Sequence, residues 1–381
     1  MHVAKEMITF DLGDKCNLQC IYCYNENERC IAPPQQTLPL KIAKAGIDMY
    51  FAQNPSRHIR FYGPGEPTQQ FDRMKEITEY AKSASDNVTM EIQTNGIFTD
   101  EVREWLLDNA NIIWMSFDGP SDIQNHNRPL NPEFFADFGG RTSAEILEDN
   151  VRWLNQNKGD RDLMVGARVT MTYDNINRQR EMIDYFSGLG IKYVWTNPLF
   201  YGVDQIPVCD DPEKQAGFQF NMDGYVDQYI DAFHYAKEKD VFWGSFLMIN
   251  FDGESPCHCR ACLPAPHLTP DGYLSACDMV TSGANPHHMA PLVYGKYNSE
   301  TNAFDIYEDK VQALQERCST NMKHCQNCPA KMHCGGSCLG EVVNESGDLL
   351  GRTLASRGVC NAVRRLWREL GPQESNEYLH P

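Results

Sequence analysis

The chain has 381 residues, of which 41% are hydrophobic and 23% are charged, a composition typical of a globular protein with one large core or two or three domains. Its formal charge of −18 argues against a surface that follows nucleic-acid phosphates, and no run of about 20 apolar residues indicates a membrane span. Fifteen cysteines without a secretory signal favour metal or cluster ligation in a reducing, cytoplasmic compartment over a disulfide framework.

Apolar runs that are typical of strands alternate with helical patterns over about the first 200 residues. The expected strands are 7–12, 58–62, 88–93, 112–117, 163–171 and 192–196, and the expected helices are 40–52, 72–84, 100–109, 143–157 and 177–188. Six strands in alternation with helices predict a parallel sheet with the helices outside it. Cysteine-, glycine- and amide-containing segments follow these strands, at the end where barrel enzymes have their sites.

The rest of the chain divides into two parts. A helical pattern at 222–239 and a short apolar run at 241–249 indicate a linking region. From about Pro256 the chain is rich in cysteine, glycine and proline, and we expect such a segment to build little core and to depend on bound metal to fold. The expected division is therefore 1–205, 206–255 and 256–381.

Three cysteines, Cys16, Cys20 and Cys23, follow the first expected strand with C-x3-C-x2-C spacing. Three thiolates on a short loop can hold three irons of a cubane cluster and leave the fourth iron without a protein ligand. A structural zinc loop is the alternative for such a triplet taken alone. The spacing, together with the aromatic Tyr22 before the last cysteine, resembles the signature of the radical SAM enzymes, in which S-adenosylmethionine (SAM) chelates the open iron.

A second motif, Gly63-Pro64-Gly65-Glu66-Pro67, follows the second expected strand. It resembles the family's Gly-Gly-Glu-Pro stretch, which meets the SAM amino group. Gly65, Glu66 and Pro67 match, whereas Pro64 departs from the pattern. Glycine lets the backbone come close to a ligand, and backbone carbonyls or Glu66 can accept hydrogen bonds from an ammonium group. A plain turn is the alternative interpretation.

Three further polar residues resemble the family's SAM- and substrate-facing positions. Asn95 lies after the third expected strand, Ser116 near the end of the fourth, and Arg168 on the fifth. By resemblance the two short side chains hydrogen-bond SAM or substrate, and Arg168 meets the SAM carboxylate. Ordinary turns and a simple ion pair are the alternatives.

The C-terminal cysteines form a pattern of C-x9-G-x4-C, then C-x2-C-x5-C-x3-C, then one more cysteine. This seven-cysteine pattern resembles the SPASM extension of radical SAM enzymes, which binds two auxiliary [4Fe–4S] clusters. By resemblance the ligands of the first are Cys262, Cys277, Cys338 and either Cys257 or Cys259, and those of the second are Cys325, Cys328, Cys334 and Cys360. Zinc is the alternative metal, because paired thiolates also suit it.

Asp278 directly follows Cys277 and is expected beside the first auxiliary cluster. A carboxylate there can take a proton as a substrate radical is oxidised. Anaerobic sulfatase-maturating enzymes have an aspartate with that role at the matching place, and a surface acid in a turn is the alternative. Cys209 or Cys318 can instead donate a hydrogen atom, as in related peptide epimerases, although an inert buried thiol is the more usual state.

These motifs together resemble a radical SAM enzyme with a SPASM domain, over about 16–200 and 257–360. The resemblance implies an α/β fold, namely a partial (β/α)6 TIM-type barrel with a C-terminal cysteine-rich, iron–sulfur-binding domain. It implies SAM and three [4Fe–4S] clusters as cofactors, and an external one-electron donor of the flavodoxin or ferredoxin type. In the family, SAM is cleaved to a 5′-deoxyadenosyl radical that abstracts hydrogen from the substrate.

SPASM enzymes mostly modify peptides or proteins, and neither a nucleic acid nor a membrane is an expected partner. Our first expectation is a maturase that forms oxidative side-chain cross-links in a ribosomally made peptide. The alternatives are formylglycine formation in a sulfatase, supported by Asp278, a small-molecule dehydrogenase, and, outside enzymes, a zinc- or cluster-bearing binding protein. Because the first expected strand begins at about Met7, we expect the barrel and SPASM surface, or a separate partner, to recognise a peptide leader.

Overall fold

The structure is a computed structural model and describes residues 7–23, 36–199, 222–283, 289–352 and 354–374. Two of the fifteen cysteines, Cys30 and Cys209, lie outside the described residues. The alternative hydrogen-atom donor predicted at Cys209 therefore lies outside the described part of the chain.

The described strands form one sheet of 11 strands in the order β11-β10-β9-β8-β1-β2-β3-β4-β5-β6-β7. Their bounds are β1 Ile8–Phe10, β2 His58–Phe61, β3 Thr89–Thr94, β4 Ile112–Ser116, β5 Met164–Met171, β6 Tyr193–Pro198, β7 Phe242–Ser245, β8 His267–Leu268, β9 Tyr273–Ser275, β10 Val293–Asn298 and β11 Ala303–Ile306. Neighbouring strands from β1 to β7 are parallel, as the alternating pattern predicted. The α/β barrel-type architecture is thus confirmed.

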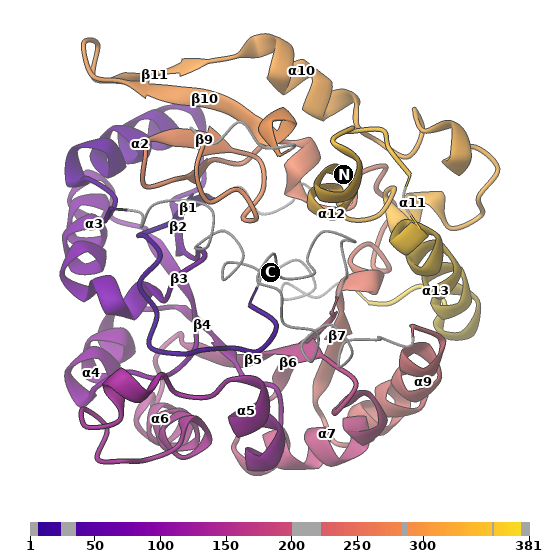
Figure 1. Cartoon of the computed structure of the whole chain (residues 1–381), viewed down its shortest axis with the longest axis horizontal. Helices are drawn as coiled ribbons and strands as arrows, with labels where there is room; N and C mark the ends of the chain where they lie inside the picture. Colours follow the sequence, from indigo (N-terminus) through magenta and orange to yellow (C-terminus); the bar gives the residue numbers. More distant parts are fainter. Residues whose placement is uncertain (1–6, 24–35, 200–221, 284–288, 353, 375–381) are drawn as a thin grey trace.

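The helices of the barrel lie outside the strands, and Figure 1 shows α2, α3, α4, α6, α7 and α9 surrounding β1 to β7. The described α-helices are α2 Leu40–Gln53, α3 Phe71–Ala84, α4 Asp100–Asn109, α5 Ser121–Asn127, α6 Ser143–Asn157, α7 Gln179–Gly188, α9 Met222–Glu238, α10 Glu308–Glu316, α11 Lys331–Cys334, α12 Leu339–Ser346 and α13 Leu354–Leu370. None of the helices in the described segments is long and apolar enough to cross a membrane.

The linking region continues the barrel. The helical pattern at 222–239 is α9, and the apolar run that follows it contains β7, which pairs in parallel with β6. Trp243 of β7 is buried with the rest of the core, because both faces of a parallel strand are covered. The parallel series therefore has a seventh strand that the sequence pattern did not predict.

The C-terminal part extends the same sheet from its other end. β8 lies parallel to β1, with Thr9 opposite His267 and Phe10 opposite Leu268, and β8 to β11 then continue as antiparallel neighbours. Helix α13 packs against α9, and Trp367 of α13 lies edge-on to Phe251 with ring centroids 5.2 Å apart.

Apolar side chains of this C-terminal part belong to the same buried core cluster as the barrel; they include Leu268, Leu274, Leu292, Leu314, Leu339, Val343, Val363 and Leu366. The expectation that this part builds little core is therefore wrong. Short strands and one amphipathic helix bury apolar surface against the barrel, which a search for long periodic runs within the segment overlooks.

Candidate active site

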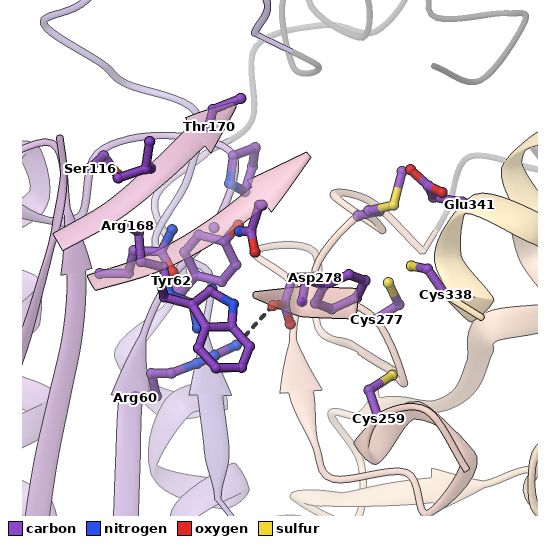
Figure 2. A pocket seen from close by; sticks show the side chains of 18 of the residues that line it. Arg60, Tyr62, Ser116, Arg168, Thr170, Cys259, Cys277, Asp278, Cys338 and Glu341 are labelled. Atoms are coloured by element: carbon purple, nitrogen blue, oxygen red, sulfur yellow. Dashed lines mark hydrogen bonds and ion pairs between the residues drawn. The ribbon is translucent and has the colours of Figure 1, made fainter. Parts of the chain in front are cut away.

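A cavity of about 450 Å³ lies between the barrel strands and the C-terminal cysteines. Most of the residues predicted for the site line it: Cys16, Cys20, Tyr22, Cys23, Gly65, Glu66, Asn95, Ser116, Arg168, Cys257, Cys259, Cys277, Asp278 and Cys338. Figure 2 shows barrel side chains on one side of this space and the thiols of Cys259, Cys277 and Cys338 on the other. Residues that are far apart in the sequence thus meet around one cavity.

The loop with the first three cysteines is fixed by backbone hydrogen bonds to the segment after α5. The amide of Gln19 donates to Pro129 O at 2.9 Å, and the amide of Ile21 donates to Asn127 O at 3.0 Å. In return the amide of Asn131 donates to Asn17 O at 2.9 Å. A loop without regular structure is thereby held with its thiols facing the cavity.

Tyr22 joins this loop to a buried ion pair. Its hydroxyl donates to Asp118 Oδ2, and Arg128 Nε lies 3.1 Å from the same carboxylate oxygen. The guanidinium of Arg128 also lies over the Tyr22 ring, 5.2 Å from its centroid. Burial is the main cause that raises the pKa of Tyr22, so the phenol stays protonated and donates. Tyr22 therefore positions the cysteine loop.

Gly65 and Glu66 connect this loop to the end of β2. A Cβ atom on Gly65 would lie 2.2 Å from the Gly13 carbonyl oxygen, so only glycine allows this approach. The amide of Glu66 donates to Lys15 O at 2.8 Å. The expected glycine contact is therefore made with the cysteine loop itself.

The carboxylate of Glu66 is buried, and both of its oxygens accept hydrogen bonds from neighbouring residues. It accepts from the amide and hydroxyl of Thr68, from Thr94 Oγ1 at 2.7 Å and from the amide of Asn95 at 2.6 Å. Burial raises the pKa of Glu66, and these hydrogen bonds oppose that effect. Glu66 thus joins the ends of β2 and β3, and Pro67, the first residue of a short 3-10 helix, is buried behind it.

Asn95 links the end of β3 to the cysteine loop. Its Nδ2 donates to Asn17 Oδ1 at 2.7 Å and lies 3.8 Å from Cys16 Sγ. Its Oδ1 accepts from the amide of Ile97 at 2.9 Å. Both ends of this amide are therefore engaged within the protein.

Ser116 and Arg168 face each other in the register of β4 and β5 and both line the cavity. The Arg168 guanidinium lies 5.5 Å from the Trp114 ring centroid. Burial, as the main cause, lowers the pKa of Arg168 to about 10, which leaves it charged at neutral pH. A hydroxyl and a cation on adjacent strands suit a carboxylate-bearing ligand such as SAM.

Asp278 faces the barrel interior across the cavity. Its Oδ2 lies 2.9 Å from Arg60 Nη2, and its Oδ1 lies 3.4 Å from His267 Nδ1. Figure 2 shows the Arg60–Asp278 ion pair joining the barrel to the segment of Cys277. Its side chain is 26% exposed, so the carboxylate reaches the cavity while two basic residues hold it.

Arg60 belongs to a row of polar side chains that crosses four neighbouring strands of the sheet. His267, Thr9, Arg60 and Glu91 occupy matching positions on β8, β1, β2 and β3. Arg60 Nε donates to Thr9 Oγ1 at 3.2 Å, and His58 Nε2 lies 3.0 Å from Glu91 Oε2. Arg60, His267 and Glu91 were not predicted from the sequence. Their signal was a polar residue at alternate positions of an otherwise apolar strand.

The thiols expected at the first auxiliary site divide into two neighbouring groups. Cys338 has Cys277 and Cys259 as electrostatic neighbours. Cys257 interacts instead with Cys262, and its further thiol neighbours are Cys318 and Cys259. Cys259 is thus the member of the 257/259 pair that neighbours Cys338, and Figure 2 shows its thiol on the same side of the cavity as those of Cys277 and Cys338.

The thiols expected at the second auxiliary site lie together away from the cavity. Cys325, Cys328, Cys334 and Cys360 are electrostatic neighbours of one another. Arg364 Nε lies 3.3 Å from Cys328 Sγ. An arginine that donates to a thiol sulfur stabilises its anionic form, which is the form that binds iron.

The donor chemistry of these groups fits iron–sulfur clusters. Among the described residues, no group of three or more His, Cys, Asp or Glu side chains is arranged to hold a single metal ion. A cubane distributes its ligands over four irons, so grouped thiols beside a cavity are the relevant feature. All twelve of the predicted cysteine ligands lie in the described part of the chain.

Comparison with known proteins places the barrel in a family. Residues 11–186 match the profile of the radical SAM superfamily. The chain is 22% identical to the radical SAM cyclopropyl synthase TigE of Paramaledivibacter caminithermalis, over 97% of this chain and 74% of that protein. It is 25% identical to a serine-type anaerobic sulfatase-maturating enzyme of Klebsiella aerogenes, over 86% of this chain and 78% of that protein.

Solved structures share the fold at low sequence identity. Native anSMEcpe with bound AdoMet and Cp18Cys peptide superposes with a TM-score of 0.71 at 14% identity, over 95% of this chain and 96% of that one. Streptococcus suis SuiB bound to the precursor peptide SuiA gives a TM-score of 0.63 at 14% identity, over 92% and 76%. The part of the chain at residues 11–186 is therefore a radical SAM domain.

Proposed function

We propose that this enzyme oxidatively modifies a ribosomally made peptide by joining two of its side chains. One observation supports the proposal: Cys16, Cys20 and Cys23 line the same cavity as Asp278 and Cys277. Hydrogen abstraction and proton removal can then act on one bound substrate.

The residues near the first three cysteines bind the cofactor in this proposal. A [4Fe–4S] cluster with SAM, when bound there, supplies a 5′-deoxyadenosyl radical. Ser116 and Arg168 orient the SAM carboxylate, and the backbone at Gly65 approaches its amino group. The cysteine loop is fixed to the strand ends by further residues that do not bind SAM in this proposal, namely Tyr22, Glu66, Pro67 and Asn95.

The C-terminal part is proposed to be a SPASM domain, at 256–381, that holds two auxiliary clusters. Cys259, Cys262, Cys277 and Cys338 form the proposed first ligand set, and Cys325, Cys328, Cys334 and Cys360 form the second. Cys259 is preferred to Cys257 because it is an electrostatic neighbour of Cys338. The proposed electron donor is an external flavodoxin or ferredoxin.

Asp278 is the proposed base. Its carboxylate reaches the cavity beside Cys277, and Arg60 and His267 fix its direction. It accepts the proton that the substrate releases on oxidation. A general base of this kind contributes roughly 10²–10⁴-fold to a rate.

A peptide substrate agrees with the chemistry of related proteins. Structures of the same fold contain bound peptides, namely Cp18Cys with anSMEcpe and SuiA with SuiB. TigE is named as a cyclopropyl synthase, an activity that forms a new bond within its substrate. These relatives support a peptide maturase over a dehydrogenase of small molecules.

The test uses the anaerobically reconstituted enzyme with SAM, a reductant and peptides encoded beside its gene. We expect 5′-deoxyadenosine and a peptide that has lost two hydrogen atoms, with fragmentation blocked between the joined residues. Cys16→Ala is expected to remain folded and to form neither product. Release of 5′-deoxyadenosine without any change of peptide mass would contradict peptide cross-linking.

Formylglycine formation is the second candidate, because the position of Asp278 after Cys277 resembles that of the sulfatase-maturase aspartate, and serine-type maturases are among the relatives. Oxidation of serine to formylglycine also removes two hydrogen atoms. The product then carries an aldehyde, which a hydrazine reagent labels, whereas a cross-linked peptide stays unlabelled. Labelling of a sulfatase-derived peptide would establish this candidate in place of the first.

A further inference from the structure

Arg317, which directly follows α10, is a fully buried arginine in the C-terminal part. Its Nη1 donates to Gly335 O at 3.0 Å, its Nη2 donates to Gly336 O at 2.6 Å, and its Nε lies 3.4 Å from Leu349 O. All three partners are backbone carbonyls. No carboxylate of the described residues forms an ion pair with this guanidinium.

The two glycine carbonyls lie on the turn that connects the two proposed auxiliary sites. This turn runs from Cys334, in the second ligand set, to Cys338, in the first. Gly335, Gly336 and Ser337 all have left-handed backbones, with φ of 59°, 88° and 71°. The chain thus reverses sharply between one ligand set and the other, and Arg317 binds it at that point.

Close packing requires glycine in the turn. A Cβ atom on Gly335 would lie 2.2 Å from the backbone carbon of Cys257, and one on Gly336 would lie 2.8 Å from Arg317 Nη1. His258 Nδ1 also lies 2.8 Å from Cys334 O. The turn is therefore enclosed between the Cys257–His258 backbone and the guanidinium.

The charge of Arg317 acts on thiols of both sites. It is an electrostatic neighbour of Cys257 and Cys262 near the first site and of Cys325 in the second. Burying a cation without an opposite charge is costly even when its hydrogen bonds are satisfied, and arginine stays charged. Thiolates on either side provide the opposite charge once they bind iron.

We propose that Arg317 is a positioning residue shared by both auxiliary sites, which raises the reduction potentials of both clusters and fixes the distance between Cys334 and Cys338. This inference rests on the proposed cluster assignment. A buried positive charge favours the more negative, reduced state of a neighbouring cluster. Its hydrogen bonds to consecutive carbonyls hold the turn, which a point charge on a flexible stem does less well.

The experiment is a redox titration of the reconstituted enzyme, followed by electron paramagnetic resonance. A Cys16→Ala, Cys20→Ala, Cys23→Ala background removes the first cluster, so that only auxiliary signals remain. We expect Arg317→Gln to move both auxiliary potentials to more negative values, and Arg317→Lys to keep them near the starting values. The matched control is Arg364→Gln, since the thiol neighbours of Arg364 are Cys328, Cys360 and Cys334, all in the second set, and it should move one potential only.

An Arg317→Gln protein in which either potential is unchanged overturns the proposal. If Arg317→Gln binds less iron, circular dichroism of the iron-free variant shows whether the chain is still folded. A normal fold with iron lost from both sites supports the proposal. An unfolded chain contradicts it. The proposed clusters are tested separately by the parent protein. If the triple-cysteine background binds no auxiliary iron, the cluster assignment fails, whatever Arg317 does.

Discussion

At the scale of single residues, the polar side chains beside Arg60 explain how the Asp278 carboxylate is kept in place at the edge of an apolar barrel. Arg60 lies between the apolar Ile59 and Phe61 in its strand, yet it pairs with Asp278, contacts Thr9 and lies 5.0 Å from the Tyr62 ring centroid. Burial acts to lower the pKa of Arg60, and the charges of Asp278 and Glu91 outweigh it and raise the pKa. Arg60 therefore stays charged beside Asp278.

Removal of either partner separates SAM cleavage from product formation. Asp278→Asn should lower peptide product about 10²-fold or more while 5′-deoxyadenosine still forms, because a base is lost and the cofactor site is intact. Arg60→Met should lower product about 10-fold, since Asp278 then lacks its main partner. Liquid chromatography with mass spectrometry measures both products. The control is Arg180→Gln, whose side chain is exposed and pairs with Asp231, and a loss of 5′-deoxyadenosine in Asp278→Asn would contradict the prediction.

Glu91 predicts an acid dependence of stability. Burial acts to raise its pKa, but the hydrogen bond from His58 and the charges of His58, Arg60 and Arg168 lower it to about 2. Because the folded pKa lies below the unfolded value of about 4.3, the stabilisation is complete above that value and is lost as pH falls through about 2. The loss amounts to about 3 kcal/mol. Urea unfolding of the iron-free protein between pH 6 and pH 2.5 measures it, and Glu91→Gln should flatten this part of the curve.

At the scale of elements, the contact between Gly65 and the cysteine loop gives a test of loop placement. Gly65→Ala places a methyl group 2.2 Å from Gly13 O and 2.8 Å from Lys15 O, so the loop has to move. We expect less iron at the first site and at least about 10-fold less SAM cleavage, as follows from a displacement of about 1 Å. Gly188→Ala is the control, because its Cβ would meet no atom within 4 Å. Full SAM cleavage by Gly65→Ala would contradict this role of the loop.

Elements with long apolar patterns were predicted and short ones were not. The helices expected at 40–52 and 100–109 agree closely with α2 and α4. Helix α5 has seven residues and no apolar periodicity, and β8 has two residues, so neither carries a signal of its own. β8 exists because its backbone pairs with β1: Thr9 N donates to Pro266 O at 2.8 Å.

The residues of the candidate site also differ in whether the sequence predicted them. Cysteine spacing and strand-end motifs identified the thiols, Ser116, Arg168 and Asp278, because these signals are local in sequence. Arg60 was not identified, since its partner lies 218 positions away and only the strand register brings the two together. Glu66 was identified, but its four hydrogen bonds within the protein depend on neighbours that the motif does not contain.

At the scale of the whole molecule, the shared core predicts that removal of iron leaves the fold largely intact. Apolar side chains of the C-terminal part, such as Leu268 and Val363, are buried in one cluster with those of the barrel. Chelation under reducing conditions should therefore preserve most of the helical circular dichroism and a single unfolding transition. A large loss of helical signal on chelation, with only the barrel still unfolding cooperatively, would show that the C-terminal part folds around its metal.

Iron stoichiometry tests the complete arrangement of thiols. Three clusters predict about 12 irons and 12 sulfides per chain in the reconstituted protein. Cys277→Ala should reduce both values by about four, and Cys318→Ala should change neither, since Cys318 lies outside the proposed ligand sets. A zinc-containing protein almost free of sulfide would contradict the cluster assignment, and about eight irons would leave one auxiliary site without its cluster.

The pairing of β8 with β1 has a consequence for biosynthesis. β1 is the first described strand to leave the ribosome, whereas its neighbour on one side, β8, follows about 250 residues later. Until then one edge of β1 has unsatisfied backbone groups, and such an edge invites pairing with other chains. The nascent barrel therefore remains open while most of the protein is translated, and addition of β8 closes this edge and completes the contact between Asp278 and Arg60 in the same event.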